Sequence, residues 1–212
     1  MDIIKVMIVD DHIIFRKGLR TILNEIDEVK VVAEASNGNE LLDLLKKMQT
    51  DIIFMDIRMP VMDGIEATKK VTEKYPAIKI IALTMFEEVT YFNEMIEAGA
   101  AGFLLKKTTT GELKRAIEAV LNDDTYFSEE FIASATRYQK VKPKDPDVRL
   151  SERELEVLDL ICMGYSNVEI AKFLGVSQRT VDGHRARLFE KTGAKNAPNL
   201  VLYAVKNGLV RT

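Results

Sequence analysis

Three aspartates and two other polar residues stand at the ends of short apolar runs. Asp10 and Asp11 follow the run IKVMIV, and Asp56 closes the run IIFMD. Thr84 closes the run KIIALT, and Lys106 follows GFLL. If these runs are neighbouring parallel strands, all five side chains meet at one edge of a sheet, which is where α/β folds bind their ligands.

This set of side chains favours phosphoryl chemistry with a divalent cation. Three carboxylates in one cleft repel each other, and a hard cation keeps all three ionised. Oxygen ligands, with no cysteine or histidine in the predicted set, favour Mg²⁺. A threonine hydroxyl and a lysine ammonium suit the oxygens of an incoming phosphoryl group. Asp56 is then the expected nucleophile, because carboxylates form aspartyl-phosphates in other proteins.

Two alternatives apply to these aspartates. A single aspartate at a strand end is most often a helix N-cap or a turn residue. Only the joint occurrence of several such groups, each of a suitable type, favours the phosphoryl site. A phosphatase with an aspartate nucleophile would need a D-x-D arrangement, which is missing because Ile57 and Arg58 follow Asp56.

Charge is unevenly distributed along the 212 residues, whose formal net charge is −3. Residues 1–122 hold 16 basic and 20 acidic side chains, whereas residues 172–212 hold eight basic and two acidic ones. The basic C-terminal end indicates a polyanionic partner. The single cysteine, Cys162, excludes an internal disulfide framework and a multi-cysteine zinc site.

The segment SNVEIAKFLGVSQRTVDGHRARLFEKTG has the order of a helix-turn-helix motif. A capped helix is followed by a turn through Gly175 and by a longer basic helix at 178–192. At about 100° per residue, Val181, His184 and Leu188 share one face of that helix. We expect this face to pack on the preceding helices, with His184 half-buried.

The opposite face of the basic helix is predicted to enter the major groove of DNA. Gly183 and Ala186 are small, so the backbone can approach the bases. Arg185 and Arg187 flank this face and are placed for phosphates. Asp182 is the expected base reader, accepting from cytosine N4. The full predicted DNA-binding set is Arg179, Thr180, Asp182, Gly183, His184, Arg185, Ala186, Arg187 and Lys191. A four-helix protein-interaction module is the alternative for this part of the chain.

Strand-like and helix-like stretches alternate over residues 1–122. The strand-like runs lie at 4–9, 29–35, 51–55, 78–83 and 102–105, and the helical patterns at 12–24, 38–49, 64–75, 89–98 and 110–121. Continuously apolar runs are typical of strands covered on both faces. The alternation predicts a doubly wound α/β fold with a five-stranded parallel sheet, and the site requires the strand order 2-1-3-4-5.

Residues 123–149 break this alternation. Two prolines and many charges predict a partly helical linker here. A short helix is expected at its start, containing Tyr126, Phe127, Phe131 and Ile132. The pattern then becomes all-helical, with helices near 152–163, 167–174, 178–192 and 198–207. The sequence therefore predicts a first domain at 1–122, a linker at 123–149 and a small all-α domain at 150–212.

The motifs IVDDH, MDIRMPVMDG, ALTMF and AGFLLK, in this order, make residues 3–121 resemble the receiver domain of two-component response regulators. The resemblance implies a flavodoxin-like fold in which a sensor histidine kinase phosphorylates Asp56. It implies that Asp11, Asp56 and the backbone carbonyl of Arg58 bind Mg²⁺, with Asp10 nearby.

The same resemblance assigns three further residues. It implies that Thr84 and Lys106 hold the phosphoryl group, and that Phe103, three residues before that lysine, is the aromatic switch residue. One position departs from the common pattern, because Lys107 stands where many receivers have proline.

Residues 148–212 resemble the LuxR-type helix-turn-helix domain, from LSERELEVLDLICMGYS through to the closing YAVKNGLV. The two domains together resemble the NarL/FixJ family of response regulators. This implies a DNA-binding transcription factor, controlled by phosphorylation, whose homodimer reads two half-sites. The helix at 198–207 is then a dimerisation face or part of the core. Asp182 stands where many members have lysine.

Two other functions stay open on the sequence alone. One is a phosphorylation-independent DNA binder with a vestigial receiver, and the other is a phosphorelay or enzyme-regulating protein whose tail binds protein. We expect no enzyme activity beyond the receiver's own phosphoryl transfer and dephosphorylation. Because the apolar runs are strand-sized and the N-terminus lacks a signal-peptide layout, we expect a cytoplasmic protein without a membrane partner.

Overall fold

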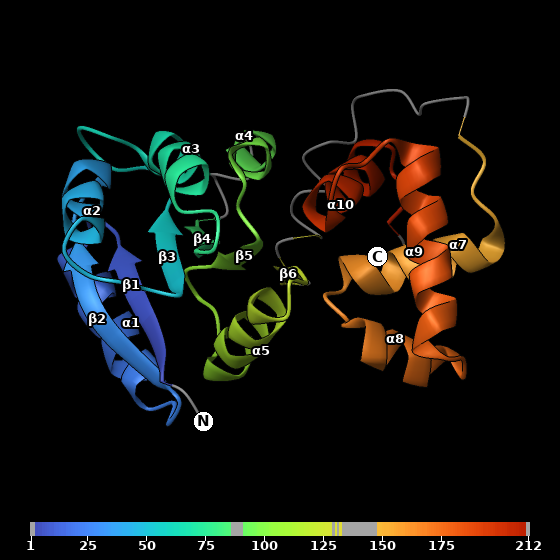
Figure 1. Ribbon diagram of the computed structural model, residues 1–212, viewed down its shortest axis with the longest axis horizontal. Helices are drawn as coiled ribbons and strands as arrows, with labels where there is room; N and C mark the ends of the chain where they lie inside the picture. The colour runs from blue at the N-terminus through green and yellow to red at the C-terminus, as the bar shows by residue number, and fades with distance from the viewer. Residues whose placement is uncertain (1–2, 86–90, 129, 131, 133–147, 211–212) are drawn as a thin grey trace.

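The computed structural model describes residues 3–85, 91–128, 130, 132 and 148–210. An α/β domain is followed by a helical domain, and the two lie against each other (Figure 1). The α/β domain contains a parallel sheet with the strand order β2-β1-β3-β4-β5-β6. Its strands are β1 (Ile4–Val9), β2 (Val29–Ala35), β3 (Ile52–Asp56), β4 (Lys79–Thr84), β5 (Gly102–Leu105) and β6 (Tyr126–Phe127).

The doubly wound fold and the five predicted strands are confirmed, but the sheet has six strands rather than five. Tyr126 and Phe127 form β6, not the predicted helix, because they pair with the open edge of β5, where Gly102 and Phe103 are their partners. A two-residue strand is too short to carry an alternating pattern, so the sequence does not reveal it. The expected helix also included Phe131, which lies outside the described residues.

Helices cover both faces of the sheet. The helices α1 (Ile13–Asn24) and α5 (Thr110–Leu121) pack on one face, and α2 (Gly38–Leu45), α3 (Gly64–Lys74) and α4 (Phe92–Ala98) on the other. The strands are therefore buried on two sides, which explains why their sequences are almost continuously apolar. Because β2 and β3 lie on opposite sides of β1, the chain reverses direction across the sheet there. This reversal opens a crevice at the carboxyl ends of β1 and β3.

The helical domain contains α7 (Glu152–Cys162), α8 (Asn167–Leu174), α9 (Gln178–Thr192) and α10 (Ala197–Lys206). Ser151 and Ser166 form capping boxes at the starts of α7 and α8, each with a glutamate at the third helical position. Gly175 ends α8 with a φ of +64°, so the turn into α9 requires a residue that tolerates the left-handed region. This helix–turn–helix order positions α9 for contact with a partner.

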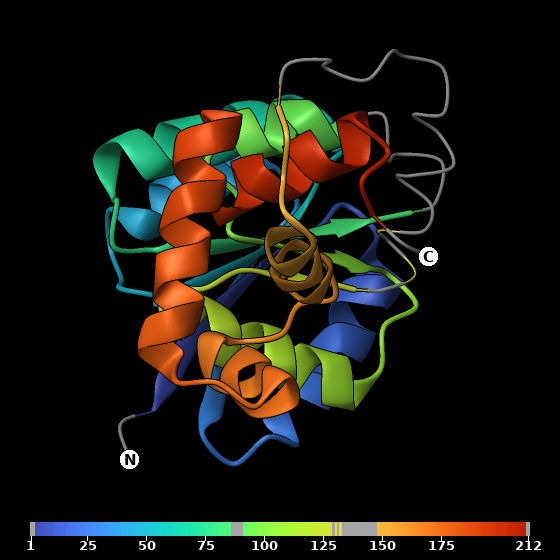
Figure 2. The same cartoon turned by 90° about the vertical axis from the view of Figure 1, so that its right-hand side faces the viewer.

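The two domains share one hydrophobic core. The cluster on the α2–α3–α4 face of the sheet continues without interruption into the core of the helical domain. The contact runs through α4 and α10, which lie side by side in Figure 2. Most of α10 is buried, including Val201, Leu202 and Val205. The predicted linker at 123–149 overlaps β6 at its start, and its middle, 133–147, lies outside the described residues. The predicted domain bounds stay predictions.

No helix in the described part of the chain is long and apolar enough to cross a membrane.

Candidate functional site

Acidic side chains gather at the carboxyl ends of β1 and β3. One ligand atom from each of Asp10, Asp11, His12 and Asp56 lies within 4.8 Å of the others. Asp10 is fully buried and Asp56 is 1% exposed. The predicted meeting of strand-end aspartates is therefore present. Carboxylates this close and this buried need a compensating positive charge.

Lys106 supplies part of that charge. Its Nζ lies 2.8 Å from Asp56 Oδ2 and 3.0 Å from Asp10 Oδ2. Burial on its own lowers the pKa of Lys106, but the hydrogen bonds and charges of Asp56 and Asp10 outweigh it and raise the pKa above its usual value. Lys106 therefore stays protonated. One ammonium against three carboxylates leaves the cluster negative, which suits a divalent cation.

The backbone holds Asp56 in place. The Ile57 N–H donates to Asp56 Oδ1 at 2.9 Å, and the Gly64 N–H donates to the Ile57 carbonyl at 2.9 Å. Gly64 begins α3, and a Cβ there would lie 2.0 Å from the Asp56 carbonyl oxygen. Only glycine allows α3 to approach the acceptor residue this closely.

Thr84 and Phe103 stand on the neighbouring strands. Thr84 ends β4 and is fully buried, and its hydroxyl donates to the Met85 carbonyl at 3.0 Å. The Lys106 N–H donates to the Thr84 carbonyl at 2.9 Å, which fixes the two residues side by side. Phe103 on β5 is fully buried, with its ring 4.9 Å from that of Phe92 on α4.

His12 and the side chain of Arg58 make contacts at the site that the sequence did not predict. His12 Nδ1 lies 3.0 Å from Asp11 Oδ1 and 3.2 Å from Asp10 Oδ1. The sequence signal that could have indicated the His12 contacts is the position of His12 directly after Asp10 and Asp11. The Arg58 side chain lies over the Tyr91 ring, 5.0 Å from its centroid, and donates to the Tyr91 hydroxyl at 2.5 Å. Its predicted role through the backbone carbonyl is not tested by these contacts.

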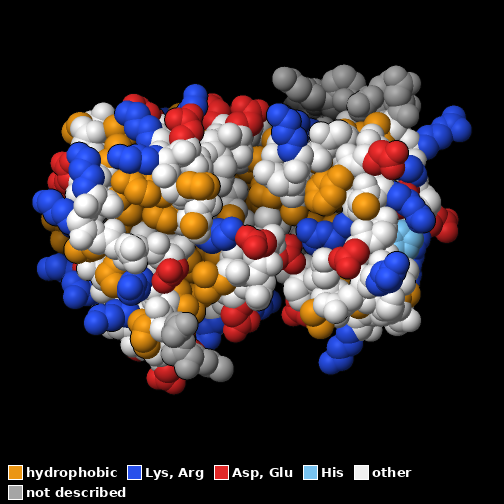
Figure 3. All heavy atoms as spheres, in the orientation of Figure 1, with side chains coloured by type: hydrophobic (Ala, Val, Ile, Leu, Met, Phe, Trp, Pro, Cys, Tyr) orange, Lys and Arg blue, Asp and Glu red, His pale blue; other side chains and the backbone are white. Residues whose placement is uncertain are grey.

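The helix α9 divides into a buried and an exposed side, as its pattern predicts. Val181 and Leu188 are fully buried. The predicted DNA-binding residues are exposed at Arg179, Thr180, Asp182, Ala186, Arg187 and Lys191, and half-buried at Gly183, His184 and Arg185. Basic side chains, with some acidic ones among them, lie over this side of the helical domain in Figure 3. The Nδ1 atom of His184 is buried without a hydrogen-bond partner among the described residues.

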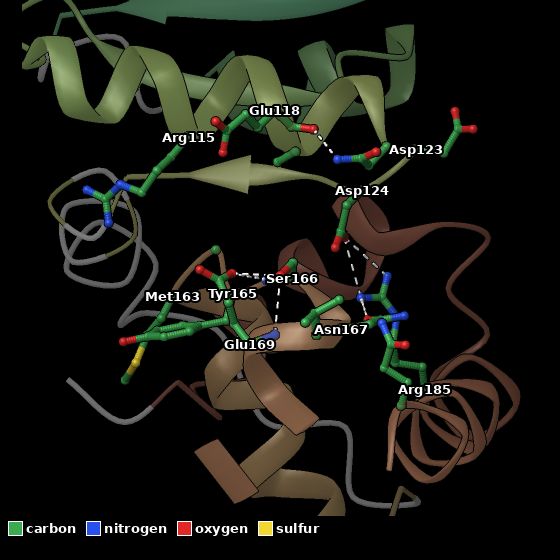
Figure 4. A pocket seen from close by; sticks show the side chains of 15 residues that line it. Arg115, Glu118, Asp123, Asp124, Met163, Tyr165, Ser166, Asn167, Glu169 and Arg185 are labelled. Carbon is green, nitrogen blue, oxygen red and sulfur yellow. Dashed lines mark hydrogen bonds and ion pairs between the residues drawn. The ribbon is translucent and has the colours of Figure 1, made fainter. Parts of the chain in front are cut away.

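Arg185 contacts the α/β domain. Its guanidinium donates to Asn167 Oδ1 at 2.7 Å and lies 3.4 Å from Asp124 Oδ1 (Figure 4). The same asparagine donates to Asp182 at 2.8 Å. These contacts lie beside a cavity of about 640 Å³ between α5, the α7–α8 turn, α8 and α9. A side chain predicted to meet DNA phosphate thus meets a carboxylate of the first domain.

Lys191 has a structural partner. Its Nζ lies 2.7 Å from Glu154 Oε2 and joins the end of α9 to the start of α7. Burial alone would raise the pKa of the Glu154 carboxyl, but Lys191 and Ser151 lower it more, so the pKa lies below its usual value. Glu154 is therefore ionised at neutral pH, and Lys191 compensates its charge.

Together, the two domains define a class of protein. A parallel α/β domain gathers carboxylates around a lysine at its strand ends, and a helix-turn-helix domain lies against it. Residues 6–118 match the response regulator receiver domain, and residues 148–204 match the bacterial regulatory proteins of the luxR family. The chain belongs to the two-component response regulators, with the domain composition of the NarL/FixJ family. It is a phosphorylation-controlled, DNA-binding transcription regulator rather than an enzyme with substrate turnover.

The similar proteins match this chain over nearly its whole length, and over nearly their own whole length. The oxygen regulatory protein NreC from Staphylococcus aureus strains bovine RF122 / ET3-1 and MRSA252 is 37% identical over 215 residues, covering 97% of this chain and 99% of NreC. Among solved structures, the response regulator ChrA of a heme-sensing two-component system has a TM-score of 0.56 at 30% identity, covering 99% of this chain and 100% of ChrA. An RcsB–DNA complex has a TM-score of 0.60 at 28% identity, covering 97% of this chain and 99% of RcsB.

Proposed function

We propose that Asp56 is the phosphoryl acceptor of this response regulator and that a sensor histidine kinase is the donor. The observation that carries the proposal is the position of Lys106, whose ammonium bridges Asp56 and Asp10 at 2.8 and 3.0 Å. A buried ammonium between two carboxylates is suited to the oxygens of a phosphoryl group, because it is already desolvated and oriented.

The acidic cluster fits Mg²⁺. Asp10, Asp11 and Asp56, with the backbone carbonyl of Arg58, would hold the ion, since hard oxygen ligands and excess negative charge are what it prefers. When bound, Mg²⁺ offsets the charge on the phosphoryl oxygens.

The chemical step belongs to Asp56. One of its carboxylate oxygens attacks phosphorus, the P–N bond of the donor's phosphohistidine breaks, and an acyl phosphate forms. The histidine nitrogen leaves with the bonding electron pair and takes a proton from solvent. Lys106 and Thr84 hold the transferred group through charge and a hydroxyl hydrogen bond. Attack of water on the acyl phosphate later returns Asp56 to its carboxylate and releases inorganic phosphate.

The helical domain reads DNA through α9. Arg179 and Arg187 are exposed and are assigned to phosphates, whereas Gly183 and Ala186 let the helix approach the major groove. Asp182 remains the assigned base reader. Because a related solved structure contains two RcsB dimers bound to two parallel DNAs, we assign this chain a homodimer on DNA. Because DNA is its assigned partner, we assign the protein to the cytoplasm.

The contact between Asp124 and Arg185 supports a closed resting state. Asp124 occupies the guanidinium that we assign to DNA phosphate. The helix α4 covers part of α10, the helix for which the sequence leaves a dimerisation face and core packing as alternatives. Phosphorylation of Asp56 then acts by separating the domains, since a charge added at the strand ends biases a two-state contact.

Acetyl phosphate with Mg²⁺ tests the proposal. We expect a mass increase of one phosphoryl group and tighter binding to a duplex that the phosphorylated protein selects from a random-sequence pool. Affinity must fall steeply with salt, as it does for phosphate-contacting proteins. DNA binding without any mass increase would favour a DNA binder with a vestigial receiver. A mass increase without a change in DNA affinity would refute control of DNA binding by phosphorylation.

Replacing Asp124 by asparagine tests the closed state. The amide keeps the shape that caps the Thr125 N–H but removes the charge facing Arg185. Loss of about 1 kcal/mol from the closed form gives about fivefold tighter DNA binding by the unphosphorylated protein, measured by fluorescence anisotropy. Asp123→Asn is the control, because Asp123 pairs with Lys79 within the first domain. Equal affinities of the two variants would refute the contact as a restraint.

A further inference from the structure

We propose that the segment 124–128 carries the phosphorylation signal between the domains, and that Phe127 is its positioning residue. This inference rests on the proposed function, because it explains how a change at Asp56 reaches α9. The segment contains β6, the strand that the sequence did not predict. Its residues contact the expected switch residue Phe103, the α7–α8 turn and α9.

Phe127 packs directly on the switch residue. The ring of Phe103 is stacked on that of Phe127 at 5.6 Å with 13° between the planes, and Phe92 closes the group edge-on, 5.8 Å from Phe127. All three rings are buried at 1% exposure or less. In close-packed surroundings, one ring cannot change position unless its neighbours also move. A different Phe103 rotamer must therefore displace Phe127 or α4.

The backbone makes the same connection. Phe103 pairs with Phe127 in the sheet, and the Ser128 N–H donates to the Phe103 carbonyl at 3.3 Å. Among the described strands, β6 pairs with β5 alone and has two residues. Such a short edge strand shifts as a unit, since few ladder hydrogen bonds hold it.

The other side of β6 touches the helical domain. Gly164, in the α7–α8 turn at a φ of +79°, lies against it: a Cβ on Gly164 would stand 3.3 Å from the Tyr126 ring and 3.4 Å from the Phe127 carbonyl oxygen. Two residues before Tyr126, Asp124 faces Arg185 of α9. Movement of β6 therefore changes both contacts together, without requiring the linker at 133–147 to transmit force.

Replacing Phe127 by leucine tests this route. We expect Phe127→Leu to acquire the same phosphoryl mass as the unchanged protein, because β4 and β5 lie between Phe127 on β6 and Asp56 on β3. Coupling of this kind is worth roughly 5- to 150-fold in affinity. We expect the ratio of DNA affinities with and without acetyl phosphate to fall from that range to within about twofold, as required for lost coupling. The ratio is measured on the selected duplex.

Phe54→Leu is the matched control. Phe54 is equally buried, but it lies in the cluster on the opposite face of the sheet. A merely structural role would make the two variants lose similar thermal stability and keep the ratio. Retention of the ratio by Phe127→Leu overturns the inference. If the unchanged protein itself gains no mass or shows no ratio, the proposed function fails instead.

A second variant acts from the helical side. The methyl group of Gly164→Ala presses on Tyr126, so we expect tighter DNA binding by the unphosphorylated protein. Gly208→Ala supplies the same kind of backbone strain, at a φ of +62°, with no atom within 4 Å of its Cβ. DNA affinity that rises equally in both variants, or in neither, contradicts the contact between the turn and β6.

Discussion

Asp56→Asn is expected to abolish the mass increase on incubation with acetyl phosphate and Mg²⁺. Asparagine has nearly the shape of aspartate, so the Ile57 N–H keeps an oxygen acceptor. The amide cannot form an acyl phosphate, and it removes one of the two carboxylates paired with Lys106. DNA affinity should then stay at its unphosphorylated value whether or not the donor is present. Mass spectrometry and anisotropy measure the two results on one sample.

Asp43→Asn is the control for this result. Asp43 is an exposed carboxylate on α2 that pairs with Lys46, away from the acidic cluster. It should take up one phosphoryl group and respond on DNA like the unchanged protein. A mass increase that survives Asp56→Asn would mean that another side chain is the acceptor, and the assignment of Asp56 would be wrong.

Gly64→Ala is expected to have the largest effect on stability. The added Cβ would lie 2.0 Å from the Asp56 carbonyl oxygen, and neither backbone can move without displacing α3 or the end of β3. We expect a loss of about 2–4 kcal/mol in the free energy of unfolding of the receiver domain, as for severe overpacking. This corresponds to a fall in Tm of about 10 °C. Mg²⁺ affinity, followed by calorimetry, should fall as well because Asp56 moves.

Gly18→Ala provides the comparison. Gly18 lies within α1, and no atom stands within 4 Å of a Cβ built there. Alanine at a helical position normally adds about 0.5–1 kcal/mol. The two glycines should therefore respond with opposite signs in thermal unfolding. Similar Tm changes in both variants would show that α3 does not approach Asp56 as closely as described.

Local pattern predicted most of the fold. The five strands and the four C-terminal helices have strong periodicity and explicit end signals, such as the capping boxes at Ser151 and Ser166. The strand β6 was missed because two residues carry no period, and its pairing depends on the free edge of β5. For predicting the site, the strand order was more important than the exact strand bounds. That order makes β1, β3, β4 and β5 neighbours, so the residues at their ends come together.

The site was predictable in its members but not in its contacts. Asp10, Asp56 and Lys106 could be named because parallel strands end at the same edge of a sheet. The pairing of Arg185 with Asp124 joins residues 61 positions apart in different domains, and no spacing in the sequence encodes it. Likewise, Lys191 was assigned to DNA because it is basic, whereas its partner Glu154 was hidden in a capping box.

The uninterrupted core between α4 and α10 gives the resting arrangement a distinct heat-capacity signature. Separating the domains exposes apolar surface to water, and the free energy that opposes such exposure weakens on cooling. A closed state that is stabilised by apolar contacts between the domains is therefore less stable relative to the open state at low temperature. If the proposed closed state masks the DNA-binding surface, the unphosphorylated protein should bind promoter DNA more tightly as the temperature falls.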